Sequence, residues 1–392
     1  MKKFLEGSHA VAEAVKLCKP KVISAYPITP QTHIVERLAE FVSNGEIDSQ
    51  FVNVESEHSA ASVVLGASAT GVRVFTATSS QGLLLMSEVL FNIAGMRLPV
   101  VLVCANRAVS APINIWNDLQ DSISQRDSGW VQFYVENNQE AYDFVFQAYR
   151  IAEDPKIMLP VMINMDGYIL THGMEIVETV EQELVDNFLP PYNPPYKLDV
   201  DNPLSLGLLG DPTVYLETRY ALHKTLEELL NLIPKIGLEF KSMFGRDGVD
   251  LVEPYLIDDA QVVIVSMGSV CGTIKDFIEQ KRKKGKKIGL LRIITYRPFP
   301  KDKIFEYLKN KNTIIVLDKA ISLGNEGPLF SEIRSLFSKK KPKINGFVAG
   351  LGGRDITFDT LEEMLKLSRK TPTRCEFLNL NKSLLSDSFY VS

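Results

Sequence analysis

Residues 51–71 read FVNVESEHSAASVVLGASATG, and this stretch decides the fold that we predict. Residues 51–54 are typical of a short buried strand, whereas the small residues after Glu57 predict a helix that packs closely on its neighbours and ends at Gly71. Glu57 therefore stands at a strand-to-helix corner. Because the helix dipole favours an acid at this position, a structural role is one interpretation of Glu57, and its surroundings decide whether a chemical role is the better one.

Two further strand ends carry polar residues in the first part of the chain. Thr29 lies in the stiff segment YPITP, which follows a predicted strand at residues 22–25, and Arg107 follows an apolar strand at residues 99–104. The alternation of strands and helices predicts an α/β fold with a doubly wound parallel sheet. Because parallel strands bring their carboxyl ends to one edge, we expect Thr29, Glu57 and Arg107 at a common ligand site. A rigid turn is the alternative interpretation of the proline segment.

The composition is that of a globular protein, and it excludes several classes of function. The chain has 392 residues, of which 45% are hydrophobic and 23% charged, so we expect more than one domain. The net charge of -5 is not that of a general nucleic-acid binder, and two basic runs at residues 281–287 and 339–343 are interpreted as solvated surface. Because there is neither a long apolar run nor a signal peptide, we expect a cytoplasmic protein without a membrane partner.

Neither the cysteines nor the acidic residues predict a metal centre on this chain. The four cysteines are too far apart in sequence for an iron–sulfur or zinc motif. Residues 114–130 are polar and predict a functional loop or a partner surface rather than core. Asp118 and Asp121 in this segment could ligate a metal, but the segment lacks the glycine and the terminal glutamate of a calcium loop.

The pattern of elements predicts four regions. They are a first domain at residues 1–178, a proline-rich crossover and helical linker at 179–253, a second α/β domain at 254–371 and a C-terminal tail at 372–392. In the second domain, Gly268 opens a helix directly after an apolar strand, as in half of a dinucleotide fingerprint. The G-x-G-x-x-G spacing is absent, so we interpret this as a tight turn, with a nicotinamide-linked dehydrogenase as the alternative.

Several motifs occur together in an order that resembles one known family. YPITP, VESEHSA, SSQGLLLM and PVVLVCANRAVSAP in the first part, with ITYRPFP, DKAISLGNEGPL and GLGGRD in the second, resemble the alpha subunits of the pyruvate:ferredoxin oxidoreductase family and its 2-oxoacid relatives. The resemblance covers roughly residues 7–370. It implies a pyrimidine-binding domain of a thiamine diphosphate enzyme, followed by a domain like the C-terminal domain of transketolase.

The resemblance also implies roles for residues at the strand ends. The catalytic residue would be Glu57, whose carboxyl shares a proton with N1′ of the coenzyme's aminopyrimidine ring. Thr29 and Arg107 would bind the carboxylate of the substrate, Arg107 by a charge-assisted contact. The residues that would line the coenzyme pocket beside Glu57 are Tyr26, Pro27, Ile28 and Thr29.

The sequence lacks the motif that holds the diphosphate and its magnesium in such enzymes, because no GDG is followed at the right distance by asparagine; residues 246–248 (RDG) are the nearest fragment. The resemblance therefore implies that Mg²⁺ and the [4Fe-4S] clusters are on partner chains. A beta subunit would complete the shared thiamine diphosphate site, gamma and delta subunits would join it, and ferredoxin would accept the electrons.

We therefore predict the alpha subunit of an enzyme that converts pyruvate and CoA to acetyl-CoA and CO2 and reduces ferredoxin. Pyruvate is favoured because residues 114–130 resemble the corresponding loop of pyruvate enzymes. The alternatives are a 2-oxoisovalerate or 2-oxoglutarate enzyme of the same family, and a scaffold subunit without chemistry of its own.

Overall fold

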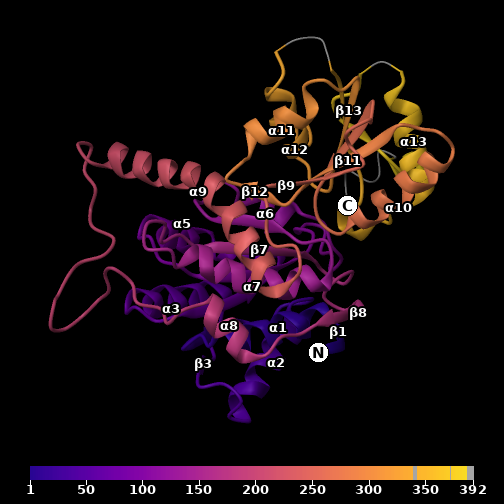
Figure 1. Cartoon of the computed structure of the whole chain (residues 1–392). Helices are drawn as coiled ribbons and strands as arrows, with labels where there is room; N and C mark the ends of the chain where they lie inside the picture. Colours follow the sequence, from indigo (N-terminus) through magenta and orange to yellow (C-terminus); the bar gives the residue numbers. More distant parts are fainter. Residues whose placement is uncertain (339–341, 371, 386–392) are drawn as a thin grey trace.

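The computed structural model describes residues 1–338, 342–370 and 372–385, and it has two α/β parts joined by a long helix (Figure 1). Its described residues form a seven-stranded sheet, a six-stranded sheet and a two-stranded antiparallel pair. The parallel sheets with helices between their strands confirm the predicted α/β fold class.

The first sheet has the strand order β12-β6-β7-β5-β4-β2-β3 and is parallel from β6 to β3. Helices α1, α2 and α7 pack in the core on one face, and α3 and α5 pack in the core on the other, so the sheet is doubly wound as predicted. The elements of this part are β1 (Lys2–Glu6), α1 (Gly7–Cys18), β2 (Val22–Ser24), α2 (Thr32–Ser43), β3 (Gln50–Val52), α3 (Glu57–Ala69), β4 (Val74–Thr78), α4 (Ser80–Leu85), α5 (Ser87–Gly95), β5 (Val101–Asn106), α6 (Gln120–Ser124), β6 (Val131–Tyr134), α7 (Asn138–Ala152), β7 (Val161–Asp166) and β8 (Met174–Glu178).

The order of the strands places a topological switch point at β2. The chain runs from β2 to β3 on one side and then returns to β4 on the other side of β2. In open parallel sheets, ligands bind beyond the carboxyl ends of the strands at such a point. This rule predicts a ligand site at the segments that follow β2, β3 and β4.

The second sheet has the order β15-β14-β13-β10-β11-β9, and only the β9–β11 pair of its described strands is antiparallel. Helices α10 and α13 cover one face, and α11 and α12 pack between the other face and the first part. The elements are α8 (Gln182–Phe188), α9 (Tyr215–Phe244), β9 (Val252–Tyr255), β10 (Val262–Ser266), α10 (Val270–Lys283), β11 (Ile288–Ile293), β12 (Thr295–Arg297), α11 (Lys301–Leu308), β13 (Thr313–Asp318), α12 (Pro328–Ser335), β14 (Lys343–Val348), the 3-10 turn Leu351–Gly353, α13 (Phe358–Ser368), β15 (Glu376–Phe377) and the 3-10 turn Lys382–Leu384.

The two parts share a core and a strand. Strand β12 follows the first strands of the second part but pairs antiparallel with β6 of the first sheet. Arg292 on β11 is fully buried and its guanidinium donates to Glu136 at 2.9 Å, to Glu140 at 2.7 Å and to Glu253 at 2.9 Å. Charge-assisted hydrogen bonds of this kind are satisfied only when the parts are docked, so they fix one relative arrangement.

The structure corrects two features of the sequence analysis. The strand predicted before Glu57 is present as β3, but its predicted burial is wrong. Strand β3 is the edge strand of its sheet and is half-exposed, because no neighbouring strand covers its outer side. The sequence pattern favours a linker helix at about residues 216–232, whereas α9 runs from Tyr215 to Phe244 and contains Pro234. Residues 386–392 of the predicted tail and residues 339–341 of the second basic run lie outside the described residues.

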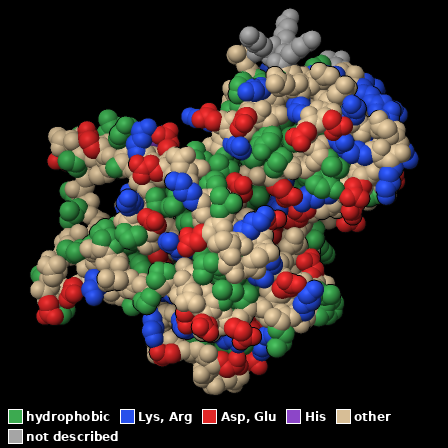
Figure 2. Space-filling view, viewed as in Figure 1, with side chains coloured by type: hydrophobic (Ala, Val, Ile, Leu, Met, Phe, Trp, Pro, Cys, Tyr) green, Lys and Arg blue, Asp and Glu red, His purple; other side chains and the backbone are tan. Residues whose placement is uncertain are grey.

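The segment before α9 stands away from the body of the protein. Figure 2 shows an opening between this segment and the two parts. Residues 207–218 are exposed throughout, and they include apolar side chains such as Leu209, which is 97% exposed. Within the residues that the structure describes, no helix combines the length and apolar character that crossing a membrane requires.

Candidate functional site

Glu57 is the first residue of α3, as the sequence predicts. The side chain of Ser56 caps the helix by accepting a hydrogen bond from the backbone N–H of Ser59 at 3.2 Å. Glu57 itself is 8% exposed, and in the part of the chain that the structure describes its carboxyl has no hydrogen-bond or ion-pair partner. A buried carboxyl without a partner is unfavourable unless a ligand supplies a donor, so this position suits a polar ligand.

The carboxyl of Glu57 lies against the backbone of Gly82 in α4. A Cβ atom on residue 82 would lie 2.7 Å from Oε1 of Glu57 and 2.5 Å from Oγ1 of Thr78, closer than Cβ atoms pack. Nearby, Oγ1 of Thr78 and Nε2 of Gln81 are buried, and no described residue bonds to them. Buried polar atoms normally have partners, so these orphaned groups next to a buried acid are what a polar ligand would satisfy.

The segment after β2 lies at the same edge of the sheet. Gln31 fixes the base of this segment by two hydrogen bonds. Its Nε2 donates to the carbonyl oxygen of Ala77 in β4 at 2.6 Å, and its backbone N–H donates to the carbonyl oxygen of Ile28 at 2.8 Å. Tyr26, Pro27 and Thr29 are exposed, and Ile28 is half-buried. The segment is thus a fixed rim with its side chains available for contact.

Arg107 reaches this rim from the end of β5. It is 7% exposed, and its guanidinium donates from Nη1 to the carbonyl oxygen of Thr29 at 2.9 Å and from Nε to that of Asn114 at 2.8 Å. Within the described ranges, Nη2 has no hydrogen-bond partner. Two nitrogens of the guanidinium are thus fixed, and the N–H groups of the third, Nη2, can bind an anionic ligand.

Asp121 on α6 also belongs to this site, whereas the sequence analysis considered it only as a possible metal ligand. Its Oδ2 accepts from the backbone N–H groups of Ser80 at 2.9 Å and Arg107 at 3.0 Å. Its Oδ1 accepts from Nδ2 of Asn106 at 2.8 Å. The ends of four strands, β3, β4, β5 and β2, are thus linked through Glu57, the Ser80–Gly82 turn of α4, Asp121, Arg107 and Thr29.

The location of Asp121 corrects the prediction that residues 114–130 form a loop or partner surface rather than core. Most of residues 117–125 are buried around α6. Leu119 and Ile123, four positions apart, were the signal of a buried helical face. The oxygens of Asp121 bond to N–H groups, and the described residues hold no group of three or more His, Cys, Asp or Glu side chains placed to bind a metal ion.

The turn at Gly268 does not offer a phosphate site. Gly268 has a φ of 78° and the turn leads into α10, as expected of a tight strand-to-helix connection. The carboxylate of Asp166 occupies its backbone donors, accepting from the N–H of Ser269 at 2.8 Å, and it bonds to Nζ of Lys319 at 2.9 Å. Burial raises the pKa of Asp166, but Lys319 and Ser269 outweigh burial and hold it below its ordinary value. A protein anion thus stands where a dinucleotide phosphate would bind.

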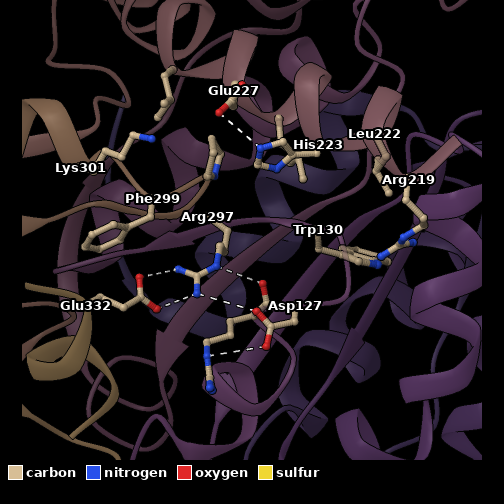
Figure 3. Close-up of a pocket in the computed structure, with 15 residues that line it drawn as sticks. Asp127, Trp130, Arg219, Leu222, His223, Glu227, Arg297, Phe299, Lys301 and Glu332 are labelled. Carbon is tan, nitrogen blue, oxygen red and sulfur yellow. Dashed lines mark hydrogen bonds and ion pairs between the residues drawn. The ribbon is translucent and has the colours of Figure 1, made fainter. Parts of the chain in front are cut away.

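A separate pocket of about 390 Å³ lies between α9 and the segment after β12 (Figure 3). None of its lining residues belongs to the chain of contacts around Glu57. Several of its charges are paired with one another: Arg297 donates to the two carboxylate oxygens of Glu332 at 2.7 and 3.0 Å. We therefore locate the candidate site at the sheet edge and not in this pocket.

Two family models match this chain. Residues 13–237 match the family model described as pyruvate flavodoxin/ferredoxin oxidoreductase, thiamine diphosphate-binding. The chain belongs to this family. Residues 260–361 match core domain II of pyruvate:ferredoxin oxidoreductase. The thiamine diphosphate-binding region of the family thus contains Tyr26, Thr29, Glu57, Arg107 and Asp121.

Relatives within the pyruvate flavodoxin/ferredoxin oxidoreductase family cover nearly the whole chain. Pyruvate synthase subunit PorA of Methanosarcina barkeri is 49% identical over 390 residues, 97% of each chain. Ketoisovalerate oxidoreductase subunit VorA of Pyrococcus abyssi is 46% identical over 373 residues, 94% of each chain.

A solved structure, the 2-oxoglutarate:ferredoxin oxidoreductase of Magnetococcus marinus with 2-oxoglutarate, coenzyme A and succinyl-CoA bound, superimposes with a TM-score of 0.71 at 20% identity. The match covers 94% of this chain and 65% of that one, and at this identity it shows the fold alone.

Proposed function

We propose that the chain is the alpha subunit of a pyruvate synthase, which converts pyruvate and CoA to acetyl-CoA and CO2 and passes the electrons to ferredoxin. The observation that carries the proposal is the carboxyl of Glu57, which is buried and has no partner among the described residues. It lies at a strand-to-helix corner inside a thiamine diphosphate-binding family region. The near-complete coverage of a relative named as a pyruvate synthase subunit supports the choice of reaction.

Thiamine diphosphate fits the groups at the sheet edge. Its aminopyrimidine ring offers a ring nitrogen for the carboxyl of Glu57, and the orphaned Thr78 and Gln81 atoms provide further polar contacts. When bound, thiamine diphosphate supplies the nucleophilic carbon and the electron sink that decarboxylation of a 2-oxoacid needs. Glu57 would hold a proton at N1′ of the bound ring.

Arg107 and Thr29 bind the carboxylate of the 2-oxoacid in this proposal. The Arg107 guanidinium is immobilised by two backbone carbonyl oxygens, so it loses little conformational freedom when it binds an anion. Its free Nη2 directs a charge-assisted hydrogen bond to the substrate. Tyr26, Pro27 and Ile28 form the adjoining wall of the coenzyme pocket.

The active site is shared with other chains in this proposal. A beta subunit supplies the diphosphate and Mg²⁺ half, because this sequence lacks the motif for it. The [4Fe-4S] clusters lie on partner chains among the beta, gamma and delta subunits. Of the cysteines here, Cys18, Cys104 and Cys271 are buried, and burial raises the pKa of each thiol, which opposes the thiolate form that a cluster needs.

A 2-oxoisovalerate enzyme is the second candidate, because a ketoisovalerate oxidoreductase subunit is nearly as similar. Steady-state turnover of the assembled complex with pyruvate, 2-oxoisovalerate and 2-oxoglutarate distinguishes the three substrates. We expect the highest kcat/KM with pyruvate, with CoA-dependent reduction of ferredoxin. A higher kcat/KM with 2-oxoisovalerate would replace the proposal by the second candidate.

A further inference from the structure

The carboxylate of Asp121 joins the ends of two strands that flank the candidate site. It is fully buried, and its Oδ2 accepts hydrogen bonds from the backbone N–H of Ser80 after β4 and from that of Arg107 after β5. Its other oxygen accepts from Nδ2 of Asn106 and from the backbone N–H of Ser122, both at 2.8 Å. Among the described residues, no lysine, arginine or histidine side chain bonds to it.

A buried carboxylate held only by neutral donors is an unfavourable arrangement unless its hydrogen bonds are needed. Burial raises the pKa of Asp121 to about 6, although Asn106 and the two backbone donors act in the opposite direction. A neutral side chain could fill the same volume with less penalty. A carboxylate is needed here because both of its oxygens accept hydrogen bonds from N–H groups.

The first of the two strand ends carries backbone strain that Asp121 offsets. Ser80 has a φ of 47°, a left-handed conformation that non-glycine residues adopt only with support. Asp121 bonds to the N–H of Ser80, and the Ser80 hydroxyl donates to the carbonyl oxygen of Ala108 at 2.5 Å. Two residues later, Gly82 lies against the carboxyl of Glu57.

The second strand end carries the substrate-binding arginine of the proposed function. The bond from the Arg107 N–H to Asp121 fixes the backbone from which the guanidinium extends. The same oxygen therefore fixes the support of Glu57 on one side and the base of Arg107 on the other.

We propose that Asp121 is a positioning residue that sets the spacing between Glu57 and Arg107, and so between the coenzyme and the substrate carboxylate. The inference rests on the proposed function of these two residues. Small displacements of substrate-binding groups lower catalytic rates strongly, so a misplaced Arg107 would affect catalysis as well as binding.

The test is a double-mutant cycle on the assembled complex. In D121N, an amide NH2 takes the place of one carboxylate oxygen. This donor then faces either the N–H groups of both strand ends or the donors of Asn106 and Ser122, so the hydrogen bonds at one side of the side chain are lost. We expect kcat/KM for pyruvate to fall about 10- to 100-fold, with the KM for CoA within about 2-fold of wild type. R107K alone and R107K with D121N complete the cycle.

If Asp121 acts through Arg107, the double variant is within about 3-fold of the worse single variant, because the two changes affect one interaction. Full multiplication of the two effects, or an unchanged kcat/KM for pyruvate in D121N, overturns the inference. The control is D143N. Asp143 is a buried acid of α7 whose Oδ1 accepts from Nη2 of Arg246 at 2.6 Å, and the substitution removes the charge from this contact. We expect it to lower the melting temperature without changing the KM for pyruvate.

A second variant covers the case that D121N does not assemble. D121E keeps a carboxylate but moves it by one methylene from the N–H groups of Ser80 and Arg107, and we expect the KM for pyruvate to rise about 3-fold with assembly intact. An unchanged KM would contradict the inference. Failure of the proposed function would be recognised separately, because the wild-type complex would then lack 2-oxoacid turnover altogether.

Discussion

Arg107 and Thr29, 78 positions apart in sequence, are joined by a hydrogen bond of 2.9 Å from the arginine Nη1 to the threonine carbonyl oxygen. The bond connects the segments after β5 and β2, which are separated in the sheet by β4. It holds a nearly buried cation at the carboxyl edge of the sheet, on the side where Glu57 begins α3. The proposed substrate site thus depends on the backbone of Thr29 as well as on its side chain.

Replacing Arg107 by lysine should impair substrate binding. A lysine has one ammonium group and cannot bond to two carbonyl oxygens and to a substrate carboxylate with fork geometry. We expect kcat/KM for pyruvate to fall by about 10- to 150-fold, the loss of one charge-assisted hydrogen bond. The control is R97K, since Arg97 also donates from its guanidinium to a backbone carbonyl oxygen, that of Met158. Equal losses in R97K and R107K would contradict a substrate role for Arg107.

Replacing Gly82 by alanine should displace the carboxyl of Glu57. The new methyl group would overlap both Glu57 and Thr78. We expect the affinity of the assembled complex for thiamine diphosphate to fall at least about 10-fold, measured by titration calorimetry. G95A is the matched control, because residue 95 is also helical and a Cβ there meets open space. Unchanged affinity in G82A would show that the carboxyl of Glu57 does not contact the coenzyme.

The 3-10 turn of the second part should contribute to the substrate site. Its Gly352 accepts a hydrogen bond from Nδ2 of Asn114 at 3.1 Å, and Asn114 in turn accepts from Arg107. Gly353 has a φ of 80°, and in G353A the added methyl group would overlap Trp116. We expect a loss of stability of more than about 1 kcal/mol and a raised KM for pyruvate.

The control for this prediction is G324A. Gly324 has a φ of 79° and open space around it, so it carries the backbone penalty without the overlap. Urea unfolding gives the stability of each variant, and turnover of the assembled complex gives its KM. If the KM for pyruvate rises equally in both variants, the 3-10 turn does not contribute to the substrate site through Arg107.

Asp318 should make folding stability fall as the pH rises towards neutrality. It is fully buried and accepts hydrogen bonds from the backbone N–H groups of Leu329 at 2.8 Å and Phe330 at 3.1 Å. Burial nevertheless raises its pKa to about 7 from an ordinary value of 3.8. Between these two values the folded chain retains a proton that the unfolded chain releases, so this group's contribution to the free energy of unfolding decreases with rising pH.

The comparison of wild type with D318N isolates this contribution. Urea unfolding at pH 5, 6 and 7 should show the stability of wild type relative to D318N falling by at most about 1.4 kcal/mol per pH unit. A difference that stays constant over this range would mean that Asp318 is ionised throughout.

The sheet and the position of Glu57 could be predicted because local patterns determine them. The small residues of α3 and the apolar runs of β4 and β5 have the period and length of their elements. The rule for parallel sheets then brought the ends of β2, β3 and β5 to one edge, where Thr29 and Arg107 meet. The chemical roles of these residues remain predictions.

The features that the sequence did not reveal all depend on contacts between distant segments. Leu119 and Ile123 indicate a buried helical face, but no local pattern shows that Asp121 beside them accepts hydrogen bonds from the backbone after β4 and after β5. Strand β12 joins the sheet of the first part although it follows strands of the second. Gly82 is an ordinary helical residue in sequence, and only the packing of α4 on α3 shows why a side chain there would collide with Glu57.

The most direct test of the central claim is the rate at which the C2 proton of thiamine diphosphate exchanges with deuterium in the assembled complex, measured by quenched-flow NMR for wild type and E57Q. If Glu57 holds the proton at N1′, E57Q should retain the coenzyme while its exchange rate falls by about 100-fold or more. A variant that binds the coenzyme and exchanges C2 at the wild-type rate would contradict the account.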